Sequence, residues 1–306
     1  MLIDKINRNL LGILIVLALT YVVSLSLKRG SSGSAVLTQD LFQVDTAQIT
    51  KILIEKQGDQ IQLSKAGNSW SITPNNGTEV PALSPRVHSL LDALLRISPS
   101  RIVSQRPDQW RDYQVDSTGQ RVQLFQGPKK SMDLIIGRGS MQDQRTYITY
   151  VRPKDENTVY VIENFSGSSV STNASNYRNK TVLNATVDSI QQIIFNYPND
   201  NDFVLMRMKN EWQINGVPAD SARVADYLNG LGRVTSTQFA DQYPLALNNP
   251  PASSMTIQTN TSPDIIIELY RAEDGKQILH SSQNPNNNFA DTAVINKLFV
   301  RSVEFK

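Results

Sequence analysis

The stretch Val80-Pro81-Ala82-Leu83-Ser84-Pro85-Arg86-Val87 returns later in the chain as Val217-Pro218-Ala219-Asp220-Ser221-Ala222-Arg223-Val224. In both copies, apolar residues follow at the three- and four-residue spacing of a helix with one buried face. They are Leu90, Leu91, Leu94 and Ile97 in the first copy, and Tyr227, Leu228, Leu231 and Val234 in the second. Because the match keeps both order and spacing, it indicates two copies of one structural unit.

Runs of alternating apolar and polar residues stand before and after each predicted helix, as expected for strands with one buried face. Before the helix, Ile49, Ile52, Ile54 and Trp70-Ser71-Ile72 of the first copy correspond to Ile190, Ile193, Phe195 and Trp212-Gln213-Ile214 of the second. After it, strands are expected at 121–126, 132–136, 147–151 and 159–162, and at 254–258, 265–270, 277–280 and 298–305. The sequence therefore predicts an α+β fold of two tandem repeats, each an antiparallel sheet with one main helix.

The start of each predicted helix carries residues that favour helix initiation. In the first copy, Ser84 is suited to the N-cap position, with Pro85 as the first helical residue. In the second copy, either Asp220 or Ser221 is suited to the same position.

Residues 10–27 carry no charged side chain and are rich in leucine, isoleucine and valine. Lys5 and Arg8 precede this run, and Lys28 and Arg29 follow it. Its length is enough for one helix to cross a bilayer. A cleaved signal peptide is the alternative, because Ser24-Leu25-Ser26 has small residues at the spacing of a cleavage site. The apolar run is longer than a usual signal-peptide core, so we expect an uncleaved, single N-terminal transmembrane helix.

The domain organisation follows from these features. We expect a cytoplasmic stub and transmembrane anchor at 1–29, a flexible linker at 30–40, a first α+β repeat at 41–165, an inter-repeat connection at 166–184 and a second α+β repeat at 185–306. The repeats are rich in uncharged polar residues, as exported bacterial domains often are. We therefore predict a single-pass protein of the bacterial inner (cytoplasmic) membrane, with the bulk of the chain in the periplasm.

The chain offers few residues for chemistry. It has no cysteine, which excludes disulfides, thiolate metal sites and a cysteine nucleophile. His88 and His280 are its two histidines, and neither a Gly-x-Ser-x-Gly nor a Gly-x-x-x-x-Gly-Lys-Ser/Thr motif is present. Its net charge is +2, without the basic stripe and interleaved aromatics of a nucleic-acid binder. We expect no catalytic residue, no cofactor, no metal site and no nucleic-acid partner.

One short pattern, aspartate followed by serine or threonine and then a small or aliphatic residue, recurs along the chain. It resembles the O-glycosylation sequon of exported proteins in the Bacteroides and Flavobacterium group. The candidate acceptors are Thr46, Ser117, Ser189, Ser221 and Thr292. The alternative is that the aspartates start helices and turns, where this residue type is favoured.

A wider set of motifs resembles a known family. These are Trp70-x-Ile72, Val80-Pro81-Ala82, Ile136-Gly137, Val159-Tyr160-Val161-Ile162 and Asn176-Tyr177-Arg178-Asn179-Lys180-Thr181-Val182. Their order resembles a bacterial domain-of-unknown-function family of extracytoplasmic tandem-repeat proteins associated with gliding-motility-type ABC transporters. In that family, an aromatic-Arg-Asp-Lys sequence joins one repeat to the next, whereas Asn179 replaces the aspartate here. The resemblance extends over nearly all of residues 40–306 and brings no catalytic residues.

The resemblance implies a non-catalytic auxiliary or interaction subunit of an ABC-transporter-type complex. The implied partners are the permease and ATPase subunits or associated envelope proteins, together with the lipid bilayer through residues 10–27. Two alternatives stay open. One is a cell-envelope glycan-binding or glycan-processing protein that uses Trp70 or Trp212 for stacking on sugars, and the other is a structural scaffold of a secretion or motility apparatus.

Overall fold

The computed structural model describes residues 41–306, except 43, 75–76, 200, 210 and 244–249. The predicted cytoplasmic stub, transmembrane helix and linker at 1–40 lie outside the described residues. Within the part that is described, no helix combines the length and the apolar character needed to cross a membrane.

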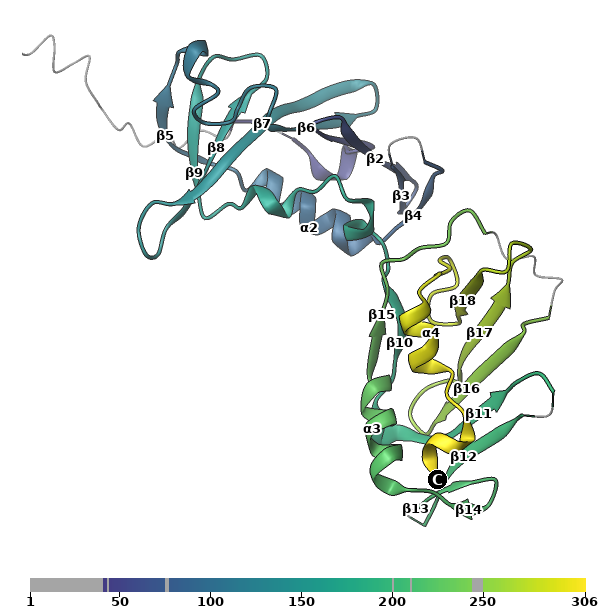
Figure 1. Ribbon diagram of the computed structural model, residues 1–306. Coiled ribbons are helices and arrows are strands. Elements are labelled where there is room, and N and C mark those ends of the chain that lie inside the picture. Colours follow the sequence, from purple (N-terminus) through teal and green to yellow (C-terminus); the bar gives the residue numbers. More distant parts are fainter. Residues whose placement is uncertain (1–40, 43, 75–76, 200, 210, 244–249) are drawn as a thin grey trace, which may run out of the picture. The chain divides into compact units, whose positions relative to one another are not determined.

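The first large sheet has nine antiparallel strands in the order β4-β3-β2-β1-β6-β7-β8-β9-β5 (Figure 1). Ile52 and Ile54 of β1 are buried and lie opposite Leu63 and Ile61 of β2, so alternate residues build one buried face. The strands are β1 (Lys51–Lys56), β2 (Asp59–Ala66), β3 (Ser69–Pro74), β4 (Val80–Ala82), β5 (Pro99–Ser104), β6 (Gln120–Gln126), β7 (Lys129–Met141), β8 (Tyr147–Pro153) and β9 (Val159–Glu163).

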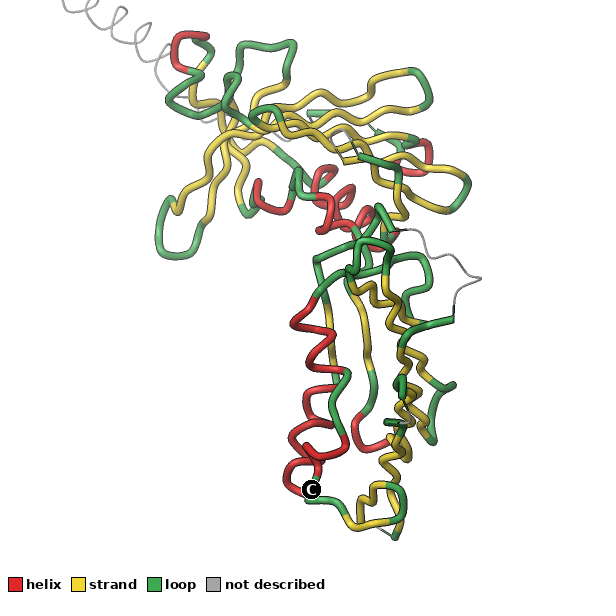
Figure 2. The backbone as a smooth tube through the Cα atoms, turned by 45° about the vertical axis from the view of Figure 1, so that its right-hand side comes forward, coloured by secondary structure: helices red, strands yellow, loops and turns green. Residues whose placement is uncertain are grey.

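Helix α2 (Ser84–Leu95) follows β4 in the sequence and lies against the first sheet in both ribbon views (Figures 1 and 2). Its buried side chains are Val87, Leu90, Leu91 and Leu94, the face that the apolar spacing predicts. The helix starts one residue earlier than expected. The carbonyl of Leu83 accepts from the amides of Arg86 and Val87, so Ser84 is the first helical residue and not the cap.

The second large sheet has seven antiparallel strands in the order β14-β13-β12-β11-β16-β17-β18. This order corresponds strand for strand to β4-β3-β2-β1-β6-β7-β8 of the first sheet, in agreement with the repeat in the sequence. Helix α3 (Ser221–Leu231) follows β14 as α2 follows β4. The strands are β11 (Ile190–Asn196), β12 (Phe203–Met208), β13 (Glu211–Ile214), β14 (Val217–Pro218), β16 (Ser253–Thr259), β17 (Ile265–Arg271) and β18 (Gln277–Ser281).

A third, two-stranded antiparallel sheet pairs β10 (Thr181–Asn184) with β15 (Arg233–Thr235). The predicted α+β class is thus confirmed for the described residues, which hold three antiparallel sheets and three α-helices. The third helix is α4 (Thr292–Leu298). Short 3-10 helices are η1 (Thr46–Gln48), η2 (Pro107–Gln109), η3 (Gly167–Ser169), η4 (Ala174–Tyr177), η5 (Val187–Ser189) and η6 (Ser302–Phe305).

The strand expected at 298–305 is wrong, because this stretch holds the end of α4 and η6. Asp291 starts α4 by accepting from the amides of Ala293 and Val294. Ile295 and Leu298 are buried three residues apart, which is the spacing of a helical face. The apolar residues of this segment alone would also suit a strand. The Asp291 cap therefore determines that the segment begins as a helix.

By their contacts, the described residues form two compact units, with limits that differ from those of the predicted repeats. The first contains 41, 42, 44, 95–120 and 133–167, and the second contains the described residues of 45–94, 121–132 and 168–306. The predicted repeat limits, 41–165 and 185–306, follow the sheets instead. The strands of the nine-stranded sheet lie between residues 51 and 163, and those of the seven-stranded sheet between 190 and 281.

The first unit contains a buried arginine, Arg152 of β8, of which only 1% is exposed. Its Nε donates to the carbonyl of Val115 at 3.1 Å. Its Nη1 donates to the carbonyls of Pro153, Lys154 and Glu156 at 3.2, 3.0 and 2.8 Å. The guanidinium carbon lies 3.7 Å from the centre of the Trp110 ring. Removal from water lowers the pKa of Arg152, and the nearby aspartates partly oppose this effect.

The N-cap of α3 gives a first testable prediction. Asp220 Oδ1 accepts from the amides of Ala222 and Arg223 at 2.9 and 3.1 Å. We expect Asp220→Ala to lower the free energy of unfolding by about 1 kcal/mol, because two amides lose their acceptor. Asp226→Ala, on the exposed side of the same helix, is the matched control and should change it by less than about 0.5 kcal/mol. Urea unfolding measures both changes. If the two variants lost the same free energy of unfolding, the assigned cap would be contradicted.

Candidate functional site

The segment around Tyr177 and Arg178, which carries the motif of the family resemblance, forms a turn of 3-10 helix followed by a strand. Asn173 caps η4 by accepting from the amide of Ser175 at 3.0 Å. Helix η4 ends at Tyr177, and β10 begins at Thr181. Asn179 Oδ1 accepts from the amide of Thr181 at 3.0 Å. This bond needs only an acceptor oxygen, so an amide side chain serves here as well as a carboxylate.

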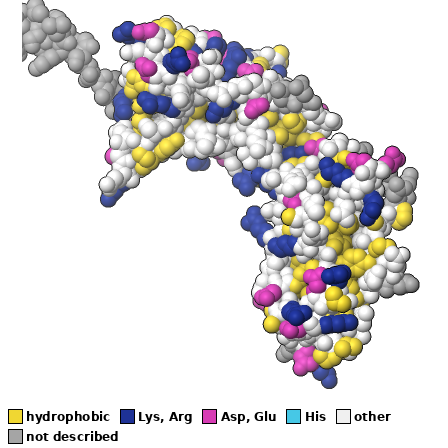
Figure 3. Space-filling model, viewed as in Figure 1, with side chains coloured by type: hydrophobic (Ala, Val, Ile, Leu, Met, Phe, Trp, Pro, Cys, Tyr) yellow, Lys and Arg dark blue, Asp and Glu magenta, His cyan; other side chains and the backbone are white. Residues whose placement is uncertain are grey.

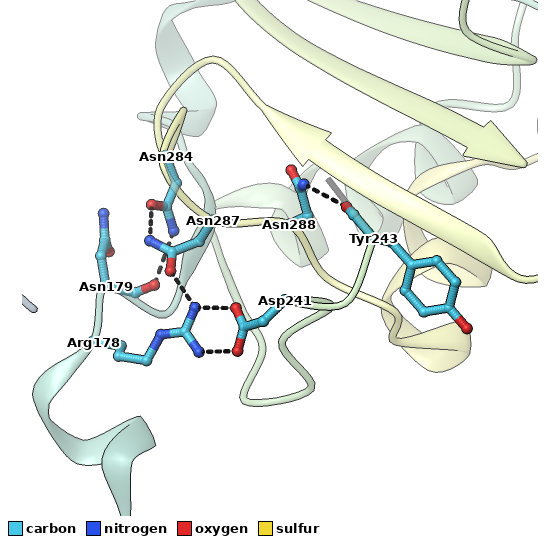
Figure 4. Close-up of polar contacts among 7 residues, drawn as sticks. All are labelled: Arg178, Asn179, Asp241, Tyr243, Asn284, Asn287 and Asn288. Atoms are coloured by element: carbon cyan, nitrogen blue, oxygen red, sulfur yellow. Dashed lines mark hydrogen bonds and ion pairs between the residues drawn. The ribbon is translucent and has the colours of Figure 1, made fainter. Parts of the chain in front are cut away.

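Arg178 is the centre of a polar cluster, shown in Figure 4. Its side chain is 4% exposed and forms a two-pronged ion pair with Asp241, with Nη1 and Nη2 donating to the two carboxylate oxygens at 2.7 and 2.6 Å. Nη2 also donates to Asn287 Oδ1 at 2.6 Å. The guanidinium carbon lies 3.5 Å from the centre of the Phe239 ring. The charge of Arg178 is therefore balanced inside the protein.

Asparagines extend this cluster to the main chain (Figure 4). Asn287 Nδ2 donates to Asn284 Oδ1 at 2.8 Å. Asn284 Nδ2 in turn donates to the carbonyls of Asn179 and Thr181, each at 2.9 Å. We define the Arg178 cluster as Arg178, Asp241, Asn284 and Asn287. It connects the segment before β10 with the loops after β15 and β18, and its side chains are joined by hydrogen bonds and one ion pair, as in a structural network.

Tyr177, next to Arg178, is also buried and fully bonded. Its hydroxyl donates to the carbonyl of Ser171 at 3.1 Å and accepts from the amide of Ser171 at 3.0 Å. Its own carbonyl accepts from the amide of Leu83, just before α2, at 2.6 Å. Burial raises the pKa of Tyr177 to about 12.

The raised pKa of Tyr177 predicts a loss of stability at alkaline pH. Because the folded-state pKa lies above the unfolded value of about 10, the contribution is complete below that pH and is lost as the pH rises towards about 12. We expect Tyr177→Phe to remove one component near pH 12 from the tyrosinate absorbance titration, while Tyr197 and Tyr227, whose pKa values burial also raises, still titrate late. The fall in unfolding free energy over this window should become smaller. Loss of the Tyr177 component near pH 10, where an exposed tyrosine titrates, would contradict the assigned burial.

A cavity of about 560 Å³ adjoins the Arg178 cluster, and every residue that lines it belongs to the second compact unit. Its walls come from α2, from the segment 168–181 and from β15. The lining residues are Leu83, Arg86, Ser89, Leu90, Ser168, Ser169, Ser171, Asn176, Tyr177, Arg178, Asn179, Lys180, Thr181, Arg233 and Thr235. Four of them are cationic and none is acidic. We call this space the basic cavity.

The five predicted acceptors of O-linked glycans lie on separate elements, and the structure does not bring them together. Thr46, Ser117, Ser221 and Thr292 are exposed, whereas Ser189 is buried and donates its hydroxyl to the carbonyl of Thr186 at 2.7 Å. The aspartates before Thr46, Ser221 and Thr292 are N-caps, as the alternative interpretation holds. Asp116, before Ser117, accepts from the amide of Thr118 in a turn. Glycosylation of these hydroxyls stays a prediction.

The histidines and tryptophans also have separate places. His88 is exposed on α2. His280 lies on β18, and its Nδ1 is 3.0 Å from Oδ1 of Asn288, in the loop that follows this strand. Trp70 is 3% exposed, and Trp212 packs against the core of the second large sheet. Among the described residues, no three His, Cys, Asp or Glu side chains gather where they could hold a metal ion. On the face drawn in Figure 3, basic side chains are scattered among acidic and uncharged ones.

Reasoning from sequence missed the partners of Arg178. Asp241, Asn284 and Asn287 lie in loops for which the sequence patterns predicted no role. One available signal was the run Gln283-Asn284-Pro285-Asn286-Asn287-Asn288, whose side-chain amides can donate and accept at once.

The fold and the Arg178 cluster define a class of protein: an α+β chain with two large antiparallel sheets of corresponding strand order. Residues 70–250 match the family model described as Domain of unknown function (DUF4340), and the chain belongs to this family. The matched region includes α2, Arg178 and Asp241, whereas Asn284 and Asn287 lie beyond it. Neither a curated protein nor a solved structure matches the chain.

Proposed function

We propose that the protein is a non-catalytic, membrane-anchored extracytoplasmic interaction subunit of an ABC-transporter-type complex. In this proposal, residues 10–27 anchor it in the bacterial inner membrane, and the folded part acts in the periplasm. The observation that carries the proposal is the corresponding order of the two large sheets, β4-β3-β2-β1-β6-β7-β8 and β14-β13-β12-β11-β16-β17-β18. Two like sheets in one chain offer a large area for binding other proteins.

The placement of the buried charges supports a binding role. Arg152 uses its donors on main-chain carbonyls, and Arg178 uses its donors on Asp241 and Asn287. Both arginines thus stabilise the fold, and neither faces a nucleophile paired with a base. Membership in the family over residues 70–250 is consistent with the proposal, and the transporter association rests on the sequence resemblance.

The experiment that tests the proposal is purification of the tagged full-length protein from cells after crosslinking, followed by mass spectrometry. We expect peptides of a permease and of an ATPase subunit at levels well above those in an untagged control. Recovery without any transporter component would overturn the proposal.

The positions of the two tryptophans weaken the glycan-binding alternative. Trp70 is buried within the first sheet, where a sugar ring cannot stack on it, and Trp212 contributes to the core of the second. We therefore retain protein binding as the proposed function.

A further inference from the structure

The basic cavity carries positive charge that the protein does not balance. Arg178 is neutralised by Asp241, which leaves Arg86, Lys180 and Arg233 as the cations of the lining. Across the described residues, these three side chains form no ion pair, and Lys180 Nζ donates only to the neutral Asn176 Oδ1, at 3.2 Å. A concave surface that carries positive charges and no negative ones concentrates anions from solution.

The remaining lining residues are suited to a ligand that carries hydroxyl groups. Ser89, Ser171, Thr181 and Thr235 contribute hydroxyls, of which Ser89 donates to the carbonyl of Pro85 and Ser171 accepts from the Asn176 amide. The Asn176 amide oxygen accepts from Lys180. A hydroxyl has one donor and two acceptor positions, so Ser89 can still accept and Ser171 can still donate, which matches the hydroxyls of a polyol. Leu83 and Leu90 add apolar surface, and the volume of about 560 Å³ lies within the range of small-molecule sites.

Arg178 gives a second, independent indication. Its Nε is buried and has no hydrogen-bond partner within the described structure, whereas both terminal nitrogens donate to Asp241 and one of them also donates to Asn287. Arg178, one of the residues that line the cavity, therefore holds a buried donor that the protein itself leaves without an acceptor.

We propose that the basic cavity binds a small anionic sugar, whose phosphate or carboxylate group contacts Arg86, Lys180 and Arg233 and whose hydroxyls contact the serine, threonine and asparagine side chains. This site goes beyond the proposed function, and its occupation does not require a partner protein. Failure of one proposal therefore leaves the other standing.

The test is calorimetric titration of the full-length protein in mild detergent with glucose 1-phosphate, galacturonate, inorganic phosphate and glucose. We expect at least one anionic sugar to bind more tightly than inorganic phosphate, glucose not to bind, and the affinity to fall as salt is added. No binding of either anionic sugar, or equal binding of glucose, would overturn the proposal. Inorganic phosphate binding as tightly as both sugars would overturn the assignment of a sugar.

Charge reversal locates the site. Arg86→Glu combined with Arg233→Glu should weaken binding of the anionic sugar at least about tenfold, because attraction becomes repulsion at two of the three cations. Arg96→Glu combined with Arg271→Glu changes the net charge equally at exposed positions outside the cavity and should preserve the affinity. Near-ultraviolet circular dichroism checks that both double variants are folded. If both double variants lost the same affinity for the anionic sugar, the sugar would bind outside the basic cavity and the proposal would be overturned.

Discussion

Replacing Arg178 with methionine should lower the free energy of unfolding by about 3 kcal/mol. The variant keeps an apolar stem of similar length but removes the ion pair with Asp241, the bond to Asn287 and the contact with the Phe239 ring. The expected loss is at the lower end of the range for a buried ion pair. Asp241 is 35% exposed, so water solvates the carboxylate that is left behind. Urea unfolding of the full-length protein measures the change.

The matched control for this prediction is Arg301→Met. Arg301 lies in the same compact unit, but its side chain is 83% exposed and its nearest carboxylate oxygen, on Glu304, is 3.8 Å away. Its replacement should cost less than about 0.5 kcal/mol. If the Arg178 and Arg301 variants lost the same stability, the Arg178 cluster would not be the structural network that its geometry describes.

Replacing Arg152 with methionine should have an effect of at least the same size, about 3 to 4 kcal/mol. The carbonyl of Val115 loses its donor inside the protein, which costs about 1 to 3 kcal/mol. Three further bonds from this charged group are lost as well, and each contributes less, because the carbonyl of Pro153 keeps the amide of Glu156 and because Lys154 and Glu156 are exposed. The contact with Trp110 is lost as well, so the near-ultraviolet signal of the folded protein should change together with the unfolding midpoint.

Arg145→Met is the control for Arg152, because Arg145 is exposed and lies in the same compact unit. Its replacement should leave both the midpoint and the near-ultraviolet signal close to those of the wild type. A small effect of Arg152→Met, equal to that of Arg145→Met, would show that water reaches the carbonyls around Arg152.

The α+β class and most of the strands could be predicted because local patterns specify them. Ile52 and Ile54 alternate with exposed or half-buried neighbours, and Val87, Leu91 and Leu94 follow helical spacing. The end of the chain could not be predicted from apolar residues alone, because the Asp291 cap decides between strand and helix there. The pair β10 and β15 was missed because two strands of three or four residues carry too little alternation to detect.

The Arg178 cluster could not be predicted because its members are far apart in the sequence. Asp241 lies 63 residues from Arg178, and Asn287 lies 109 residues away. The motif at Tyr177 and Arg178 drew attention to the right segment, but nothing local indicates which carboxylate pairs with the arginine. The basic cavity was missed for the same reason, since its cations come from α2, the segment before β10 and β15.

The measurement that tests the central claim most directly is the anchor dependence of partner recovery. The tagged full-length protein is compared with a version in which residues 1–29 are replaced by a cleavable signal peptide, so that the folded part is exported without an anchor. The proposed function predicts that quantitative mass spectrometry finds the permease and ATPase subunits with the full-length protein and at strongly reduced levels with the unanchored one. Absence of both subunits from both preparations would contradict it.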